Sequence, residues 1–311
     1  MLARLKARVD LEVAARYVLS KQGGDGGYLS FQFMDMFESS AEDTFYALYA
    51  LKLLGAEPPR TAETAGFLKR LQKEDGSYSS VEVAFFSISA LRLLGTLPRD
   101  PSGAAEYLER ALAASAETAS KVFPTFEEEQ LIDEKGVLKS KDATYVLTPA
   151  DFTPLPVRAA MATLALHALG KVNGEAEGLA RSVLMGSMNG GGFGVPAPSL
   201  EVTCWALETL SLLDSLPEAG SVEKWVLACE NEDGGFSSNP YSRTAFVENL
   251  FSGLRALEIL GSKSRYPLSH AEYVTSLQNA NGGFRRSREL GSSSLEFTYY
   301  ALRSMRLLGI L

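Results

Sequence analysis

The sequence contains very little cysteine and histidine, with two of each in 311 residues. Cys204 and Cys229 form no Cys-x-x-Cys pair, so they provide neither a disulfide framework nor a thiolate zinc knuckle. Scarce cysteine is also typical of proteins from a reducing compartment. We therefore expect two plain buried thiols and a cytoplasmic location.

Long apolar runs and positive charge are also missing. Residues 1–10 contain no apolar stretch of signal-peptide length, and no run approaches the roughly 20 residues of a membrane span. The net charge is −8, from 30 Lys and Arg against 38 Asp and Glu. This balance argues against nucleic acid and anionic membranes as partners. The hydrophobic fraction of 46% is ample for a large core.

One pattern occurs in six copies along the chain. In the last copy a predicted helix ends at Leu277-Gln278, a turn follows through Gly282-Gly283, and a second helix runs from Glu296 to Leu308. Five copies place an aromatic residue after the glycine turn: Tyr28, Tyr78, Phe193, Phe236 and Phe284. The third copy along the chain lacks the glycine turn but keeps the second helix, from Val157 to Leu169. Such a repeat predicts an array of helix pairs, in which the turn aromatic packs back between helices. We also expect the Asp-Gly or Asn-Gly of the turn to supply the left-handed residue that ends the first helix of each pair.

The second helix of each copy has two different faces. One face carries an apolar residue nine positions after the leading residue, namely Leu51, Leu91, Leu166, Leu210, Leu257 and Met305. The other face carries aromatic residues near the helix start and charged residues further on. Uncompensated charges in a dry core cost roughly several kcal/mol each, so this face needs a hollow beside it. The sequence therefore predicts a single all-α domain, an (α/α)6 toroid over residues 1–311, with six inner helices around a central cavity.

The inner face supplies two groups of candidate residues. An aromatic belt is predicted from Tyr46, Phe86, Trp205, Phe251 and Tyr300, with ordinary core packing as the alternative. Below the belt, we predict that Glu208, Arg255 and Arg303 form an ion-paired floor of the cavity.

Loop lengths differ between the copies. The loops of copies one, five and six are long, and they are neighbours if the ring closes. The third copy contains an insertion at about 115–156 that includes Glu127-Glu128-Glu129. Long loops are usually functional lids or solvated segments, and both interpretations stay open for this one.

Five of the six second helices start with a glutamate: Glu42, Glu82, Glu201, Glu248 and Glu296. An acid in the first turn of a helix is favoured by the helix dipole, which explains most of them. Glu42 and Asp43 are the candidates for a catalytic role. Together with Asp35 and Glu38 they could also hold Mg²⁺ at the mouth of the cavity.

The last copy resembles a known repeat. Leu277-Gln-Asn-Ala-Asn-Gly-Gly-Phe284, with Glu296-Phe-Thr-Tyr-Tyr-Ala-Leu302, is similar to the repeat of protein prenyltransferase β subunits and squalene/terpene cyclases. The resemblance covers all six copies. It implies a toroid that binds a polyisoprenoid chain, with the prenyltransferase zinc and diphosphate at the starts of the inner helices. The matching zinc positions are Phe246, Glu248 and Phe297, so we expect no zinc.

The resemblance also suggests site residues. The prenyltransferases hold the diphosphate with basic residues of late loops, a role that falls here on Arg243, Arg285, Arg286 and Arg288. The proton-donating Asp-x-Asp-Asp-Thr motif of the cyclases is similar to Ser40-Ala-Glu-Asp-Thr44, with Glu42 at the donor position. Whether an α-type partner subunit is needed stays open.

Three functions follow as hypotheses. The first is a prenyltransferase-like protein that binds an isoprenyl diphosphate, with Mg²⁺ as a possible cofactor. The second is a one-toroid terpene cyclase that uses Glu42 or Asp43 as the acid. The third is a non-catalytic toroid that binds a lipid or a protein.

Overall fold

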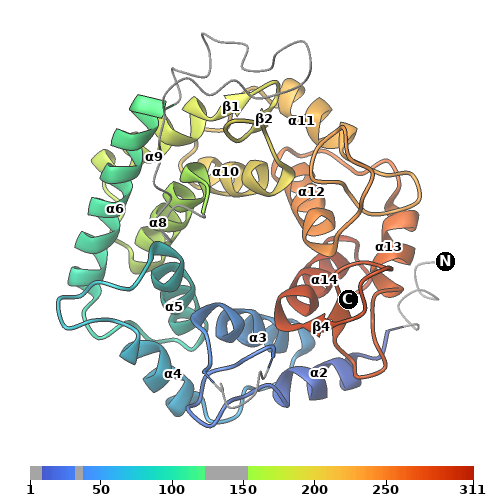
Figure 1. The fold of residues 1–311 in the computed structure, drawn as a ribbon, viewed down its shortest axis with the longest axis horizontal. Helices are drawn as coiled ribbons and strands as arrows, with labels where there is room; N and C mark the ends of the chain where they lie inside the picture. The colour runs from blue at the N-terminus through green and yellow to red at the C-terminus, as the bar shows by residue number, and fades with distance from the viewer. Residues whose placement is uncertain (1–8, 32–37, 123–152) are drawn as a thin grey trace, which may run out of the picture.

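The computed structural model describes residues 9–31, 38–122 and 153–311. Asp35 and Glu127-Glu128-Glu129 of the predictions lie outside these residues. In the described chain, twelve helices form six pairs in a ring, with one helix of each pair inside and one outside (Figure 1). The predicted all-α toroid is therefore confirmed.

The outer helices are α2 (Leu11–Leu19), α4 (Thr61–Arg70), α6 (Pro101–Val122), α9 (Gly174–Gly186), α11 (Ala219–Ala228) and α13 (Pro267–Thr275). The inner helices are α3 (Ala41–Leu54), α5 (Val81–Leu93), α8 (Leu155–Leu169), α10 (Leu200–Leu212), α12 (Val247–Ile259) and α14 (Leu295–Leu307). Each inner helix packs against the next, and α14 packs against α3, so the inner ring is closed. Helices α3, α12 and α14, which follow the long loops, are therefore neighbours, as predicted.

Serine side chains start most of the inner helices. Ser40, Ser80, Ser199 and Ser294 each accept a hydrogen bond from a backbone N–H of the first turn, which satisfies one of the free donors there. The residue two positions after each of these serines is a glutamate. The caps therefore bring these first-turn carboxyl groups to the same end of the ring.

The turn aromatics fill the space between helices. Tyr28, Tyr78, Phe193, Phe236 and Phe284 are at most 2% exposed, which confirms the prediction. Their backbone is held by the inner helix: Tyr28 N donates to Thr44 Oγ1 at 3.0 Å, and the same bond recurs in copies four and six.

The turn glycines do not end the outer helices, so the expectation from the sequence is wrong on this point. Helix α2 ends at Leu19 in right-handed backbone, and Gly26 follows later with φ of 92°. A Cβ atom on Gly26 would come within 2.6 Å of the Glu63 backbone. Glycine is required because the turn docks on the next outer helix, α4.

The ring is closed between the last and the first copy, where the glycine turn of copy six docks on outer helix α2. Gln278 donates from Nε2 to Asp10 O at 2.9 Å and accepts from Asp10 N at 2.8 Å. A side chain on Gly282 would overlap the backbone of Val13 in α2. Gln72 makes the equivalent bonds to Asp100 inside the chain.

The remaining segments lie at the periphery. Residues 115–122 of the insertion continue helix α6, and α8 begins at Leu155; residues 123–152 lie outside the described part. Two antiparallel ribbons pair β1 (Met188–Asn189) with β2 (Gly192–Phe193), and β3 (Phe284–Arg285) with β4 (Ser293–Ser294). None of the described helices is long and apolar enough to cross a membrane.

Candidate functional site

The inner helices enclose a cavity of about 140 Å³. It is lined by Phe45, Tyr46, Phe85, Phe86, Leu164, Glu201, Cys204, Trp205, Glu208, Phe251, Ser252, Tyr299, Tyr300 and Arg303. All five residues of the predicted belt are among them. Phe45, Phe85 and Tyr299 were not among the predicted site residues, although each stands one position before a belt residue.

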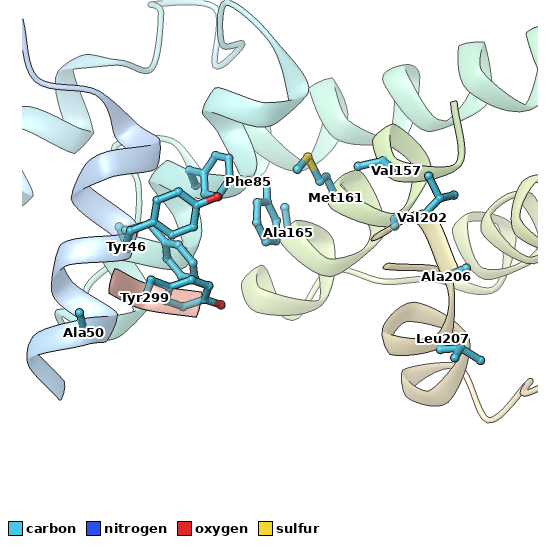
Figure 2. Packing of buried hydrophobic residues seen from close by; sticks show 14 of the residues in the cluster. Tyr46, Ala50, Phe85, Val157, Met161, Ala165, Val202, Ala206, Leu207 and Tyr299 are labelled. Atoms are coloured by element: carbon cyan, nitrogen blue, oxygen red, sulfur yellow. The ribbon is translucent and has the colours of Figure 1, made fainter. Parts of the chain in front are cut away.

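Aromatic rings fill much of the space that the sequence predicted to be hollow. Tyr46 and Tyr299 have ring centroids 4.9 Å apart, and Phe85 of α5 reaches Trp205 of α10 at 5.3 Å. Figure 2 shows Tyr46, Phe85 and Tyr299 pointing toward one another, beside the smaller Ala165 of α8. The cavity is smaller than the roughly 300–1,000 Å³ of typical ligand pockets. It therefore suits a short apolar chain unless the rings turn aside.

Carboxyl groups gather at the mouth of this cavity, where the inner helices start. Glu201 lines the cavity directly. Partial burial raises the pKa of Glu201, and repulsion from Glu248 raises it further, against the effect of Arg286. Burial also raises the pKa of Glu296, with repulsion from Glu42, Glu248 and Glu201, to about 7. The mouth therefore holds carboxyl groups whose pKa values are raised above the usual value, that of Glu296 to about 7.

Glu42 belongs to the same group. Its Oε1 accepts a hydrogen bond from the hydroxyl of Tyr46 at 3.1 Å. Burial raises the pKa of Glu42, the Tyr46 bond lowers it, and the negative charges of Asp43, Glu82 and Glu201 raise it. The predicted acid is thus placed at the mouth and is connected to the cavity wall through Tyr46.

Asp43, the other predicted acid, holds the structure together. Its carboxylate accepts from Ser30 N at 2.9 Å and from Ser30 Oγ at 2.5 Å. Ser30 Oγ in turn accepts from Leu295 N at the start of α14. Asp43 therefore ties the first loop to the last inner helix, and both of its oxygens are used for this.

The four predicted arginines do not form one cluster. Arg286 forms an ion pair with Glu248 at 2.5 Å and lies over the Phe246 ring. Arg285 donates to Ser276 O, and Arg288 to Ser276 Oγ. Arg243 and Arg288 line a separate surface pocket of about 460 Å³. Of the four, Arg286 is the one that acts electrostatically on the mouth carboxyl groups.

Two of the three predicted floor residues, Glu208 and Arg303, line the cavity, and Arg255 is bound to Glu208 from beside it. Arg255 Nε binds Glu208 at 2.8 Å, and its Nη1 binds Glu258 at 2.6 Å. Arg303 instead donates to Tyr299 Oη at 2.6 Å. Its guanidinium lies over the rings of Tyr49, Phe251 and Tyr299 at 4.9, 4.5 and 5.4 Å.

The residues at the family's zinc positions do not fit a zinc ion. Phe246 precedes α12 and Phe297 lies in the first turn of α14, and neither side chain is a ligand. The carboxylate of Glu248 is bound to Arg286. In the described residues there is no group of three His, Cys, Asp or Glu side chains suited to a metal. The predicted Mg²⁺ set includes Asp35, which lies outside them.

Comparisons with known proteins complete the description of the site. The model of the prenyltransferase alpha-alpha toroid domain matches residues 1–84 and 197–311. No curated protein matches the sequence.

Similar solved structures have low identity to the chain. Protein geranylgeranyltransferase-I of Candida albicans, complexed with GGPP, is 14% identical with a TM-score of 0.54, over 86% of this chain and 83% of that one. Type II terpene cyclase MstE from Scytonema is 13% identical with a TM-score of 0.58, over 100% of both chains. A protein from Actinoplanes is 14% identical with a TM-score of 0.56, over 96% of this chain and 98% of that one.

Proposed function

Because the chain belongs to the prenyltransferase alpha-alpha toroid family, we propose that it binds an isoprenoid chain in the central cavity and protonates one of its double bonds. The observation that carries the proposal is the position of Glu201. Its carboxyl group lines an aromatic cavity at the crowded mouth, where burial raises its pKa. A raised pKa keeps a carboxylic acid protonated to higher pH, which suits general acid catalysis.

The chemistry balances without a second substrate. The Glu201 O–H bond breaks, a C–H bond forms at one alkene carbon, and the positive charge moves to the other carbon. Loss of a proton from a neighbouring carbon to the carboxylate restores the acid and leaves an isomerised or cyclised product. The faces of Tyr46, Phe86 and Trp205 can stabilise the intermediate cation by cation–π attraction. The neighbouring carboxyl groups of Glu42 and Glu296 also have raised pKa values.

Related proteins support an isoprenoid ligand. One solved neighbour, type II terpene cyclase MstE, is complexed with geranylgeranyl dihydroxybenzoate as its substrate. Another, the Candida albicans geranylgeranyltransferase-I, is complexed with GGPP. Isoprenoid chains are thus the ligands of two proteins with this fold.

Binding of an isoprenyl diphosphate is the second candidate. It is favoured by Arg286 at the mouth and by the free N–H groups at the starts of the inner helices, which attract anions. Repulsion from Glu42, Glu201 and Glu296 opposes it wherever these groups are ionised. Two unit charges near a protein surface interact by about 4 kcal/mol at 4 Å, so the carboxyl groups weigh heavily. The small volume of the cavity, about 140 Å³, also favours a chain without a diphosphate.

The test combines binding and turnover. Geraniol, farnesol, geranylgeraniol and their diphosphates are titrated by calorimetry, and the products are analysed by mass spectrometry. We expect an alcohol to bind and isomerise without an acceptor, and Glu201→Gln to abolish turnover but retain binding. Glu106→Gln, on the exposed surface of α6, is the matched control and should behave as wild type.

The other outcomes identify the alternatives. Tighter binding of a diphosphate, lost in Arg286→Ala, would establish the second candidate. Binding without turnover in any variant would refute protonation and leave a non-catalytic lipid-binding toroid. If no isoprenoid binds, the cavity proposal is wrong.

A further inference from the structure

Arg303 is a cation at the inner end of the cavity that makes no ion pair with any described residue. The floor carboxylate Glu208 and the nearby Glu258 are both bound by Arg255. Within the described part of the chain, the Arg303 side chain makes one hydrogen bond, to Tyr299 Oη. A guanidinium has five N–H donors in a planar fork, so most of its donors have no partner among the described residues.

The surroundings of Arg303 resemble a binding pocket for a charged group. The ring centroids of Tyr49, Phe251 and Tyr299 all lie within 5.4 Å of the guanidinium carbon Cζ. Cation–π attraction to these rings offsets part of the cost of removing the guanidinium from water. Arg303 also lines the central cavity. Its free N–H groups are therefore available to a ligand inside the cavity.

The two ends of the cavity differ in their charged groups: the floor has Arg303 beside Glu208, which Arg255 already binds, whereas the mouth has carboxyl groups. Arg303 stands seven residues after Glu296, as Glu208 does after Glu201. At 1.5 Å per helical residue, the floor lies about 10 Å below the mouth carboxyl groups. An elongated ligand with one anionic end is oriented by this arrangement, with the anion at the floor and its apolar tail toward the mouth.

We propose that Arg303 binds the carboxylate head of the ligand, so that the substrate class is an isoprenoid carboxylic acid that enters head first. The inference rests on the proposed function, which it deepens by naming the head group. A carboxylate matches the planar fork of the guanidinium with two parallel hydrogen bonds. It is also smaller than a diphosphate, in a cavity of about 140 Å³. With the head at Arg303, the tail places its double bond beside Glu201.

Matched ligands test the head group. Geranic acid, geraniol, geranylamine and geranyl diphosphate are titrated by calorimetry at neutral pH. Charge-assisted hydrogen bonds are about twice as strong as neutral ones, so we expect the acid to bind about tenfold tighter than the alcohol, with the amine weakest. Arg303→Met should remove the preference for the acid and retain binding of geraniol, which also shows that the variant is folded. Arg303→Lys should restore part of it.

Controls separate this inference from the proposed function. Arg306→Met, at an exposed position one turn further along α14, should keep the wild-type preference. Glu201→Gln should lose turnover but keep the preference for the acid. If geranic acid binds no tighter than geraniol, or if the preference for the acid is unchanged in Arg303→Met, Arg303 does not bind the head group. The proposed function is not affected by this result. A diphosphate that binds tightest and depends on Arg303 overturns the carboxylate assignment, and failure of every ligand to bind overturns the proposed function as well.

Discussion

Replacing Asp43 should weaken the fold rather than remove a catalytic acid. In Asp43→Ala the backbone N–H and the hydroxyl of Ser30 lose their acceptors, which they reach at 2.9 and 2.5 Å. Ser30 Oγ is also the acceptor for Leu295 N at 3.0 Å. The substitution therefore loosens the connection between the first loop, helix α3 and the start of α14.

The expected cost follows from these bonds. A hydrogen bond to a charged group contributes about 1.5–3 kcal/mol, and a buried donor left without a partner costs about as much. Ser30 is 6% exposed, so water replaces only part of the lost bonding. We expect the free energy of unfolding to fall by about 3 kcal/mol, a large share of the roughly 5–15 kcal/mol of a typical protein.

The assay is urea unfolding followed by circular dichroism, combined with turnover measured well below the transition. Asp43→Ala should shift the midpoint to lower urea with an unchanged slope, while the folded enzyme keeps its activity. Glu201→Gln is the opposite case. Its pKa is raised in the folded state, so a neutral side chain there should keep or increase stability while turnover is lost.

Two results would refute this reasoning. If Asp43→Ala unfolds at the wild-type urea concentration, the bonds to Ser30 do not hold the ring. If Asp43→Ala loses the expected stability but is also inactive while still folded, Asp43 is the acid that the sequence first suggested. The assignment of protonation to Glu201 is then wrong.

Three further predictions concern stability. The pKa of Glu296 is about 7 in the folded protein, above its usual 4.5, so folding stability should fall as pH rises between these values, by at most about 1.4 kcal/mol per pH unit; Glu296→Gln should flatten melting temperature against pH, and an unchanged profile would contradict the shift. In Gly253→Ala the new methyl group would overlap the buried ring of Phe236, which should cost about 1–3 kcal/mol, whereas Gly178→Ala in α9 meets nothing and should be neutral or stabilising in thermal melts. The bonds of Glu230 to His270, Arg265 and Ser264 outweigh its burial and hold its pKa at about 2; its contribution should be present above pH 4.5 and disappear toward pH 2, and an acid-unfolding curve unchanged in Glu230→Ala would argue against it.

Much of the fold could be predicted because each repeat carries the same signals for two helices and the turn between them. The leucine stripe and the glycine turn occur in nearly every copy, and each copy has to bury the same face. The turn aromatics such as Phe236 are buried as expected, since the inner helix has a small residue, Gly253, opposite the ring. Where the prediction failed, at the turn glycines, the cause was a contact with the next repeat, which periodicity within one repeat does not contain.

The site was less predictable, because periodicity gives the direction of a side chain but not its partners. Glu42 and Glu201 occupy equivalent positions, yet only Glu201 lines the cavity. Glu248, at the same position again, is bound by Arg286, and the other copies have no arginine at the matching loop position. Equally, the sequence placed Arg303 and Arg255 in one ion-paired floor, and the choice of Arg255 as the partner of Glu208 depends on distances between helices.

The joint between Gln278 and Asp10 has a consequence for how the polypeptide can be threaded. It matches the joint that Gln72 makes within the chain, so the junction between the last and first copies is built like an internal one. A circularly permuted protein, opened in the surface loop before α4 and with its original ends linked, should assemble the same ring. A protein lacking one whole helix pair should not, because its two remaining edges would be set at the wrong angle to meet.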